Sequence, residues 1–251
     1  MQRWPSKLWL VRHGESAGNV ARDAAHATGS EDIGIDARDV DVPLSSLGRR
    51  QATAAGRWFG ALPQADRPEV ILSSPYLRAR STAEAVRQKL ISGHEADVIT
   101  DERLREREFG ILDRLTSFGI RQRHPELAAA RQMMGKFYFR PPAGESWCDV
   151  ILRLRSLLDT VSLHYSGKRV LIVSHQVVVL CFRYLIERLD EASILNIDAA
   201  GDVANCSVTE YVLEQRGTFA ALKLERYNFV APLEEGGAPV TSAPDAKVAA
   251  R

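Results

Sequence analysis

The sequence predicts an α/β protein: a three-layer α/β/α sandwich, phosphoglycerate mutase-like in outline, whose mostly parallel sheet has an antiparallel edge strand. Two observations predict this class. Short apolar segments rich in β-forming residues alternate with longer segments of helical periodicity, which is typical of a parallel sheet covered by helices on both faces. Near the end of the chain, strand-like segments at residues 206–214 and 219–227 are separated by Gly217, as in an antiparallel hairpin.

The first third of the chain supplies two of the expected strands. Residues 8–11 form a short apolar run that predicts a buried strand. Residues 21–42 are polar, with glycines and five aspartates, and we expect them to cross the surface as a long loop. Residues 43–62 then show helical spacing after the cap candidate Ser45, and EVILSSP predicts a second buried strand that ends at Pro75.

The middle of the chain is expected to add a helix at residues 76–90 and a strand at residues 97–100. Residues 101–144 are poorly periodic with short helical pieces, and we interpret them as a cap-like insertion within the domain. An amphipathic helix follows Ser146.

The last third begins with the strongest strand signal, KRVLIVSH at residues 168–175, followed by a helix at residues 176–189. We therefore expect a single domain over residues 1–231. Residues 232–251 are rich in Gly, Ala and Pro and are expected to form a disordered tail.

Composition excludes several classes of function. The formal net charge of +1 and the lack of a basic stripe with interleaved aromatic residues argue against nucleic acid as a partner. The three cysteines, Cys148, Cys181 and Cys206, have neither metal-ligand spacing nor an even number for a disulfide framework. No signal peptide and no run of membrane-spanning length is evident, so we expect a soluble cytoplasmic protein without a membrane partner.

Polar residues gather where the predicted strands end. In open α/β sheets, ligands bind in the crevice at the carboxyl ends of the strands. The residues delivered there, or in the segment between the third and fourth strands, are Arg12, His13, Gly14, Arg78, Arg80, Glu106, Glu108, Ser174 and His175. Two histidines, several arginines and a carboxyl group at one edge suit phosphoryl transfer, because positioned cations stabilise the charge on the phosphoryl oxygens.

The chemistry assigns each residue type a role. A neutral imidazole is a nucleophile toward phosphorus, and the phosphohistidine that forms is readily hydrolysed. A carboxylic acid can protonate the leaving alkoxide and then accept a proton from water. Glycine at position 14 would let the backbone approach a phosphate closely. Each residue alone has a structural explanation, but the set at one edge favours a site.

Five segments, in this order, resemble the histidine phosphatase superfamily, the phosphoglycerate mutase-like enzymes. They are LVRHGESAGN, PLSSLGRRQA, SSPYLRARSTAE, LREREFG and VLIVSHQ, and the resemblance extends to about Arg226. It implies that His13 is the phosphorylated nucleophile, that Arg12, Arg78 and His175 form the phosphate pocket, and that Glu106 is the proton donor and acceptor. It selects Arg78 over Arg80 and Glu106 over Glu108. No metal or organic cofactor is implied.

The resemblance extends to a few residues around the phosphate. Asn19 matches a phosphate-pocket position, and Gln176 follows the second histidine, so both are candidates for substrate binding. RPPAGES and SHQ are closer to the fructose-2,6-bisphosphatase branch and its broad phosphatase relatives than to glycolytic mutases, and Arg140 matches a bisphosphatase substrate arginine. However, Ala143 and Leu180 replace two cationic residues of that branch.

These observations leave three functions open. We favour a phosphatase that hydrolyses a phosphorylated small molecule or phosphopeptide. A phosphoglycerate mutase-type phosphomutase, which passes the phosphoryl group to a sugar acid, is the first alternative. A non-catalytic phospho-ligand binding module is the second, although binding alone needs no general acid. The physiological substrate and the oligomeric state are not fixed by the sequence, which leaves a homodimer open.

Overall fold

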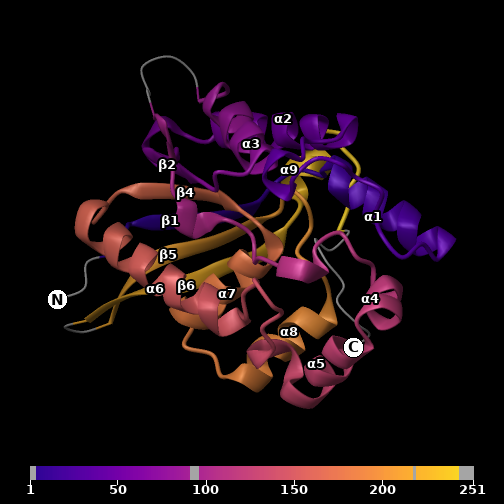
Figure 1. Cartoon of the computed structure of the whole chain (residues 1–251). Helices are drawn as coiled ribbons and strands as arrows, with labels where there is room; N and C mark the ends of the chain where they lie inside the picture. The colour runs from indigo at the N-terminus through magenta and orange to yellow at the C-terminus, as the bar shows by residue number, and fades with distance from the viewer. Residues whose placement is uncertain (1–3, 91–95, 217–218, 243–251) are drawn as a thin grey trace.

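The described residues form a six-stranded mixed sheet with the strand order β3-β2-β4-β1-β5-β6 (Figure 1). The computed structural model describes residues 4–90, 96–216 and 219–242. The parallel strands are β1 (Lys7–Arg12), β2 (Val70–Ser73), β3 (Val98–Thr100) and β4 (Arg169–Ser174). The antiparallel edge consists of β5 (Val208–Arg216) and β6 (Phe219–Phe229). The predicted fold class is confirmed.

Helices cover both faces of this sheet (Figure 1). One face packs against α2 (Ser46–Ala61) and α3 (Leu77–Arg87), the other against α6 (Trp147–His164) and α7 (Gln176–Ile186). Because successive strand residues point to opposite faces, β1 contributes to both layers. Trp9 packs with Phe59 of α2, whereas Leu8 and Leu10 belong to the core cluster around α6 and α7.

The strand register brings the site together. Arg12 of β1 is paired with Ser174 of β4, and Ser73 of β2 with Val173 of the same strand. The three strands β1, β2 and β4 therefore end at one level of the sheet. Helices α1 (Ala17–Thr28), α3 and α7 begin within a few residues of those ends, and their N-terminal amides and dipoles favour an anion there.

Helix α1 corrects the prediction of a continuous loop over residues 21–42. A capping box starts it: Ser16 Oγ accepts from Asn19 N, and the Asn19 side chain accepts from Ser16 N. The alanine-rich sequence that follows has high helix propensity, and the helix ends at Gly29, whose φ of 67° is left-handed. Residues 30–42 are a loop with only one short 3-10 turn, Asp39–Asp41.

The expected cap-like insertion at residues 101–144 does consist of short helical pieces. They are two 3-10 turns, Glu102–Leu104 and Gly110–Leu112, and the helices α4 (Ser117–Arg123) and α5 (Pro125–Tyr138). This region has a small apolar cluster of its own, formed by Leu112, Leu115, Ile120 and Phe139. Helix α8 (Glu191–Ala200), which the sequence analysis left unassigned, packs against α7.

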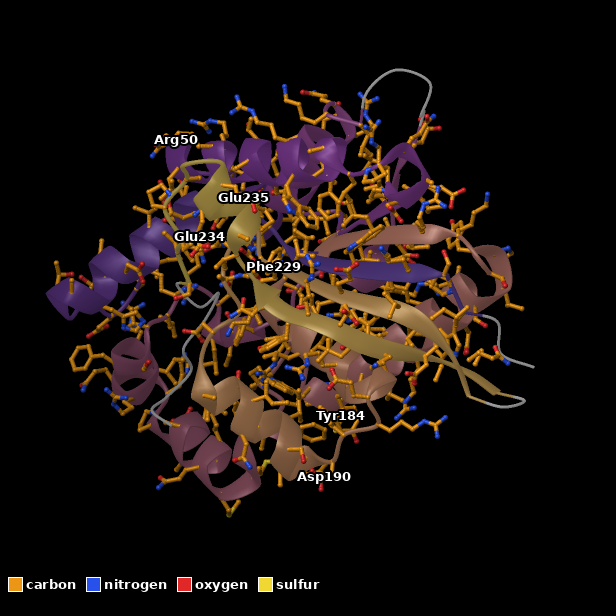
Figure 2. The ribbon with its side chains drawn as sticks, turned by 180° about the vertical axis from the view of Figure 1, so that it is seen from behind. Arg50, Tyr184, Asp190, Phe229, Glu234 and Glu235 are labelled. Carbon is orange, nitrogen blue, oxygen red and sulfur yellow. The ribbon has the colours of Figure 1, made fainter. Side chains whose placement is uncertain are left out.

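Part of the expected tail is ordered. After Phe229 at the end of β6 the chain enters α9 (Ala231–Glu235), which lies beside α2 (Figure 2). Leu233 is buried, and Gln51 of α2 donates a hydrogen bond to Pro239 O at 2.9 Å. A disordered tail from residue 232 is therefore wrong as far as residue 242, and residues 243–251 lie outside the described part of the chain. Within the described residues, no helix combines the length and apolarity needed to cross a membrane.

Candidate active site

His13 lies at the end of β1 with its side chain fully buried. Its Nδ1 is 2.7 Å from Gly14 O. A carbonyl oxygen can only accept, so Nδ1 holds the proton and Nε2 presents a lone pair. Arg78 Nε donates to this Nε2 at 3.2 Å. The backbone carbonyl thus favours the tautomer in which Nε2 carries the lone pair.

The turn after β1 is fixed by the segment that precedes β5. Arg12, also fully buried, donates from Nη1 to Val203 O at 2.6 Å. Asn205 donates from Nδ2 to His13 O at 3.0 Å, and Cys206 N donates to Arg12 O at 2.9 Å. These bonds hold Arg12 and His13 from a part of the chain about 190 residues away.

Gly14 is required by helix packing. A Cβ atom on Gly14 would lie 2.5 Å from Gly48 O, and one on Gly48 would lie 1.9 Å from Glu15 O. Neither contact is sterically tolerable, so the two glycines let the first turn of α2 pack against the turn after β1. The structure thus gives a packing reason for glycine at position 14.

Arg78, in the first turn of α3, is 3% exposed, whereas Arg80 is exposed. The Arg78 guanidinium lies over the Tyr76 ring, with Cζ 4.9 Å from the ring centroid. It also binds Asp39: Nη1 donates to Asp39 O at 2.6 Å and lies 3.0 Å from Oδ1, and Nη2 donates to Oδ2 at 3.2 Å. The arginine that the resemblance assigns to the phosphate is therefore held by a carboxylate.

His175 follows β4 and is as deeply buried as His13. Its ring centroid is 5.0 Å from that of His13 and 5.1 Å from that of Tyr76, both edge-on. Its Nε2 is 2.8 Å from Ser74 Oγ, at the end of β2. The structure therefore brings together four of the predicted residues at one sheet edge. They are Arg12, His13, Arg78 and His175.

Glu106 belongs to the segment that follows the 3-10 turn Glu102–Leu104. It is 2% exposed, and its Oε1 accepts from Arg107 N at 2.8 Å. Its neighbour Glu108 is half-exposed and accepts from the Tyr76 hydroxyl at 2.8 Å. This bond joins the segment containing Glu106 to the residue that contacts both Arg78 and His175.

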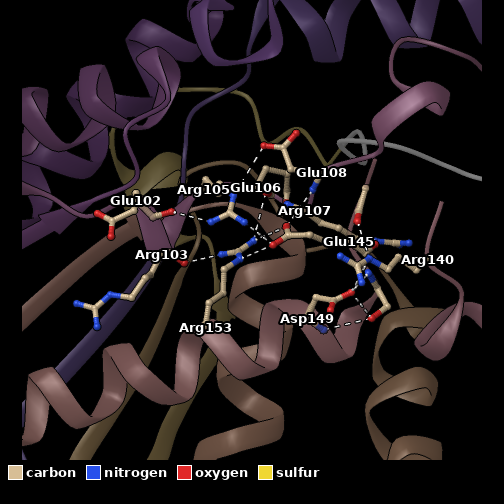
Figure 3. Close-up of polar contacts among 12 residues, drawn as sticks. Glu102, Arg103, Arg105, Glu106, Arg107, Glu108, Arg140, Glu145, Asp149 and Arg153 are labelled. Atoms are coloured by element: carbon tan, nitrogen blue, oxygen red, sulfur yellow. Dashed lines mark hydrogen bonds and ion pairs between the residues drawn. The ribbon is translucent and has the colours of Figure 1, made fainter. Parts of the chain in front are cut away.

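A network centred on Glu145 holds the Glu106 segment in place (Figure 3). Glu145 accepts from Arg105 Nη2 at 2.6 Å, from Arg153 Nε at 3.0 Å and from Glu108 N at 3.1 Å. Arg107 donates from Nε to Glu145 O at 2.6 Å, and burial lowers the pKa of Arg107 to about 10. The network anchors the segment to the start of α6.

A cleft of about 500 Å³, which includes space open to solvent, lies beside Arg78 and Glu106. Its other lining residues include Asn19, Arg22, Asp39, Asp113 and Arg114, together with the apolar side chains Ile33, Ile35, Val42 and Phe109. The loop at residues 30–42 and the segment at residues 101–144 thus both line the cleft. They are joined by hydrogen bonds from Ile33 N to Arg114 O at 3.0 Å and from Thr116 N to Glu31 O at 2.9 Å.

The remaining predicted residues differ in their position. Asn19 lines the cleft, while its Oδ1 caps α1. Gln176 follows His175 at the start of α7 and donates to Asp202 Oδ1 at 2.9 Å. Arg140 is not among the residues that line the cleft. Its guanidinium is 66% exposed and contacts Gly144 O and Asp149, so the geometry gives no support for substrate binding by Arg140.

The surroundings shift the pKa of two more groups at the site. Burial, with the nearby charges of Glu108 and Asp39, raises the pKa of Tyr76 well above its ordinary value, so its hydroxyl stays a proton donor. Burial and the charge of Asp39 also raise the pKa of Asp113, although Arg114 and Arg22 act in the opposite direction. Within the described ranges, no three His, Cys, Asp or Glu side chains are grouped so as to hold a metal ion.

Sequence reasoning missed four residues of this site: Asp39, Ser74, Tyr76 and Asn205. Ser74 and Tyr76 stand in SSPYLRAR at the end of a predicted strand, so their position was a usable signal. Asp39 and Asn205 reach the site by long-range contacts from segments without strong periodicity, and no local pattern identifies them.

The fold and this edge define a class: α/β proteins with a polar site at the carboxyl ends of parallel strands. Comparison with known proteins narrows it. The sequence model of the Histidine phosphatase superfamily (branch 1) matches residues 8–225. The chain belongs to this superfamily.

Individual relatives within this family differ in length and in name. The chain is 31% identical over 207 residues to the Bifunctional protein Rv2228c of Mycobacterium tuberculosis, covering 82% of this chain and 50% of that protein. It is 27% identical over 227 residues to 2,3-bisphosphoglycerate-dependent phosphoglycerate mutase 2 of Gloeobacter violaceus, covering 90% and 94%. The chain spans about half the length of the first curated relatives that it matches.

A solved structure shares the whole fold. The mycobacterial glucosyl-3-phosphoglycerate phosphatase Rv2419c, solved with VO3, has a TM-score of 0.66 and 26% sequence identity to this chain. The match covers 90% of this chain and 100% of that one. The neighbour is a phosphatase by its description, and the superfamily assignment rests on the family model as well as on this likeness.

Proposed function

We propose that this chain is a phosphatase that hydrolyses a small organic phosphomonoester through a phosphohistidine on His13. The observation that supports this most strongly is the state of the His13 ring. Gly14 O fixes the proton on Nδ1, and Nε2 faces the guanidinium of Arg78 beside a second buried histidine. A phosphoryl group at this edge would meet a nucleophile and positioned cations together.

In the first step, His13 Nε2 attacks phosphorus, the N–P bond forms and the bond to the leaving oxygen breaks. Glu106, in its protonated form, transfers its proton to that oxygen, so the product leaves as an alcohol. Arg12, Arg78 and the His175 ring stabilise the charge on the equatorial phosphoryl oxygens. The ends of β1 and β4 hold Arg12, His13 and His175 before substrate arrives, which limits reorganisation of these three groups in the transition state.

In the second step, water attacks the phosphohistidine and the N–P bond breaks. Glu106, now a carboxylate, accepts a proton from the attacking water and returns to its starting state. Inorganic phosphate leaves, and His13 regains its lone pair on Nε2. Asn19, which lines the cleft, and Gln176, which follows His175, are proposed to bind substrate, whereas Arg140 contacts Asp149 instead.

The first test is phosphate release from p-nitrophenyl phosphate and a panel of phosphorylated metabolites and phosphopeptides, with a chelator present. The His13→Ala variant should lose about 10³-fold or more in kcat, because the nucleophile itself is removed. His164→Ala is the matched control, since His164 is exposed at the end of α6 and precedes the start of β4, whereas His175 follows the other end of that strand. Unchanged turnover in His13→Ala would refute the mechanism.

A phosphomutase is the second candidate, favoured by the mutase from Gloeobacter violaceus that matches 90% of this chain. In that case the phosphohistidine would pass its phosphoryl group to a sugar acid rather than to water. Isomerisation of 3-phosphoglycerate that needs 2,3-bisphosphoglycerate priming and outpaces phosphate release would favour the mutase. Tight phosphate binding without any turnover would indicate a binding module.

A further inference from the structure

We propose that Asp39 is an internal competitor for the phosphoryl group, and that its displacement from Arg78 sets the apparent affinity for substrate. The Asp39 carboxylate lies 3.0 Å from Arg78 Nη1 through Oδ1 and accepts from Nη2 at 3.2 Å through Oδ2. A planar guanidinium binds a carboxylate and a phosphoryl group through the same pair of N–H groups. Asp39 therefore holds the donors that a phosphoryl group would need.

The burial of the two histidines supports this reading. His13 and His175 are both 0% exposed, and Arg78 is 3% exposed. A substrate therefore cannot reach His13 Nε2 in the arrangement described. The Asp39 side chain is 43% exposed, whereas the Arg78 side chain is 3% exposed, so Asp39 is the more accessible partner of this pair. The geometry represents a closed state that must open before the first chemical step.

The residues around Asp39 allow such a movement. We define the Asp39 loop as residues 34–41, none of which is buried. One end is held by the hydrogen bond from Ile33 N to Arg114 O, and the other by Val42, which is buried. Gly34 has a left-handed φ of 63°, and a Cβ atom there would meet nothing within 4 Å. None of the residues of the Asp39 loop belongs to the buried core, so its displacement would break the contacts with Arg78 without requiring a core side chain to move.

This inference rests on the proposed function and gives it a kinetic signature. An internal competitor lowers the fraction of molecules that can bind, so it weakens the apparent affinity for every anion that needs Arg78. In the bound complex the Asp39 carboxylate no longer contacts Arg78, so its removal should leave kcat nearly unchanged. Removing the carboxylate should therefore lower KM and the Kd for inorganic phosphate together.

The experiment compares Asp39→Asn and Asp39→Ala with the wild type by calorimetric titration of inorganic phosphate and by steady-state kinetics. Asp39→Asn removes the charge but keeps a side-chain acceptor, and Asp39→Ala removes both, while the backbone bond from Arg78 Nη1 to Asp39 O is common to all three proteins. We expect the Kd for phosphate to fall about threefold to tenfold, more in the alanine variant, with kcat within about twofold. Asp41→Asn is the matched control, because Asp41 lies in the same turn but pairs with the exposed Arg38.

A second readout separates competition from a purely structural role. Without ligand, removing the Asp39–Arg78 pair should lower the melting temperature, and saturating phosphate should restore more stability to the variant than to the wild type. A structural residue would instead lower stability and weaken phosphate binding in parallel. Lower stability without ligand combined with tighter phosphate binding is expected only if Asp39 and phosphate exclude each other.

The outcomes distinguish this inference from the proposed function. A wild type that hydrolyses substrate, with Asp39 variants that bind phosphate no more tightly, would overturn the competitor and leave the phosphatase intact. A wild type without turnover, with variants that bind phosphate more tightly, would refute the phosphatase and support the competitor. Phosphate binding that is absent from the wild type and from both variants would refute the competitor.

Discussion

The site has two halves that are built in different ways. At the strand ends, Arg12, His13 and His175 follow directly from β1 and β4, whose backbones are paired in register and fully covered by helices. In the other half, Asp39 and Glu106 are on segments without sheet or long helix, held by hydrogen bonds and an ion pair. The first half holds the groups proposed to bind and attack phosphorus, and the second holds the proposed acid and the proposed competitor.

The difference between strand ends and loops indicates which half keeps a fixed geometry and which half can move as substrate enters. Groups on strands keep their geometry because moving them would break ladder hydrogen bonds and core packing. Groups on loops can be displaced at smaller cost, which suits residues that must move as substrate enters. We therefore expect changes in the loop half to alter rate or affinity selectively, and the predictions below test this division.

The largest effect in the loop half is expected for Glu106→Gln. If Glu106 protonates the leaving oxygen, turnover of an alkyl phosphate should fall about 10²-fold to 10³-fold. Turnover of p-nitrophenyl phosphate should fall much less, because nitrophenolate leaves without a proton. Phosphate release from both substrates checks this, with Glu102→Gln, an exposed glutamate four residues earlier, as the control. Equal losses on the two substrates would contradict the role of general acid.

A smaller effect is expected for Tyr76, which connects the halves. Tyr76→Phe keeps the ring against His175 and Arg78 but removes the bond to Glu108, so only the loop half loses a contact. We expect kcat to fall about twofold to fivefold while the Kd for inorganic phosphate stays unchanged, since one hydrogen bond contributes about 1 kcal/mol.

Tyr76→Ala sharpens the same comparison. It also removes the ring that packs on Arg78 and His175, so phosphate binding should weaken as well. Titration with inorganic phosphate beside steady-state kinetics separates the two variants. If Tyr76→Phe weakens phosphate binding as much as Tyr76→Ala, the halves are not independent.

The two halves also differ in how well the sequence predicts them. Strand ends are local features: the apolar runs before His13 and His175 predict both the strands and their meeting at one edge. The resemblance then separates Arg78 from Arg80 and Glu106 from Glu108, and in each pair the structure buries the first residue more than the second. The sheet half of the site was predictable because its geometry follows from periodicity.

Apart from Glu106, the loop half and the segments around it were not predictable, for physical reasons that differ by residue. Asp39 reaches Arg78 only because residues 31–33 bond to residues 114–116, which is a long-range contact. Helix α1 was missed because its capping box uses Asn19 where a glutamate is the usual signal. The ordered part of the tail depends on packing. Leu233 is buried beside α2, and no sequence pattern around Pro232 predicts this contact.

The smallest predicted effect concerns Asp113, on the cap-like wall. Burial and Asp39 raise its pKa in the folded protein, so its ionised form is less favourable there than in the unfolded chain. This penalty is absent below the pKa of the unfolded chain and grows as pH rises through the folded pKa. Asp113→Asn, which keeps the acceptor for Arg114 N, should therefore raise the melting temperature at pH 7 and lose this advantage near pH 3.

The size of the change in melting temperature of Asp113→Asn tests how strongly the loop half excludes solvent. The Asp113 side chain is 41% exposed, so solvent screens its charge and the gain should stay under about 1 kcal/mol, or about 1–3 °C for a chain of this length. Melting curves of Asp113→Asn and of the exposed control Asp36→Asn at both pH values measure it. A gain well above this limit would show that the cleft excludes water as strongly as the strand ends do, and the division between a rigid half and a displaceable half would fail. A gain within the limit that disappears at low pH would place Asp113, like Asp39, on a wall that solvent already reaches.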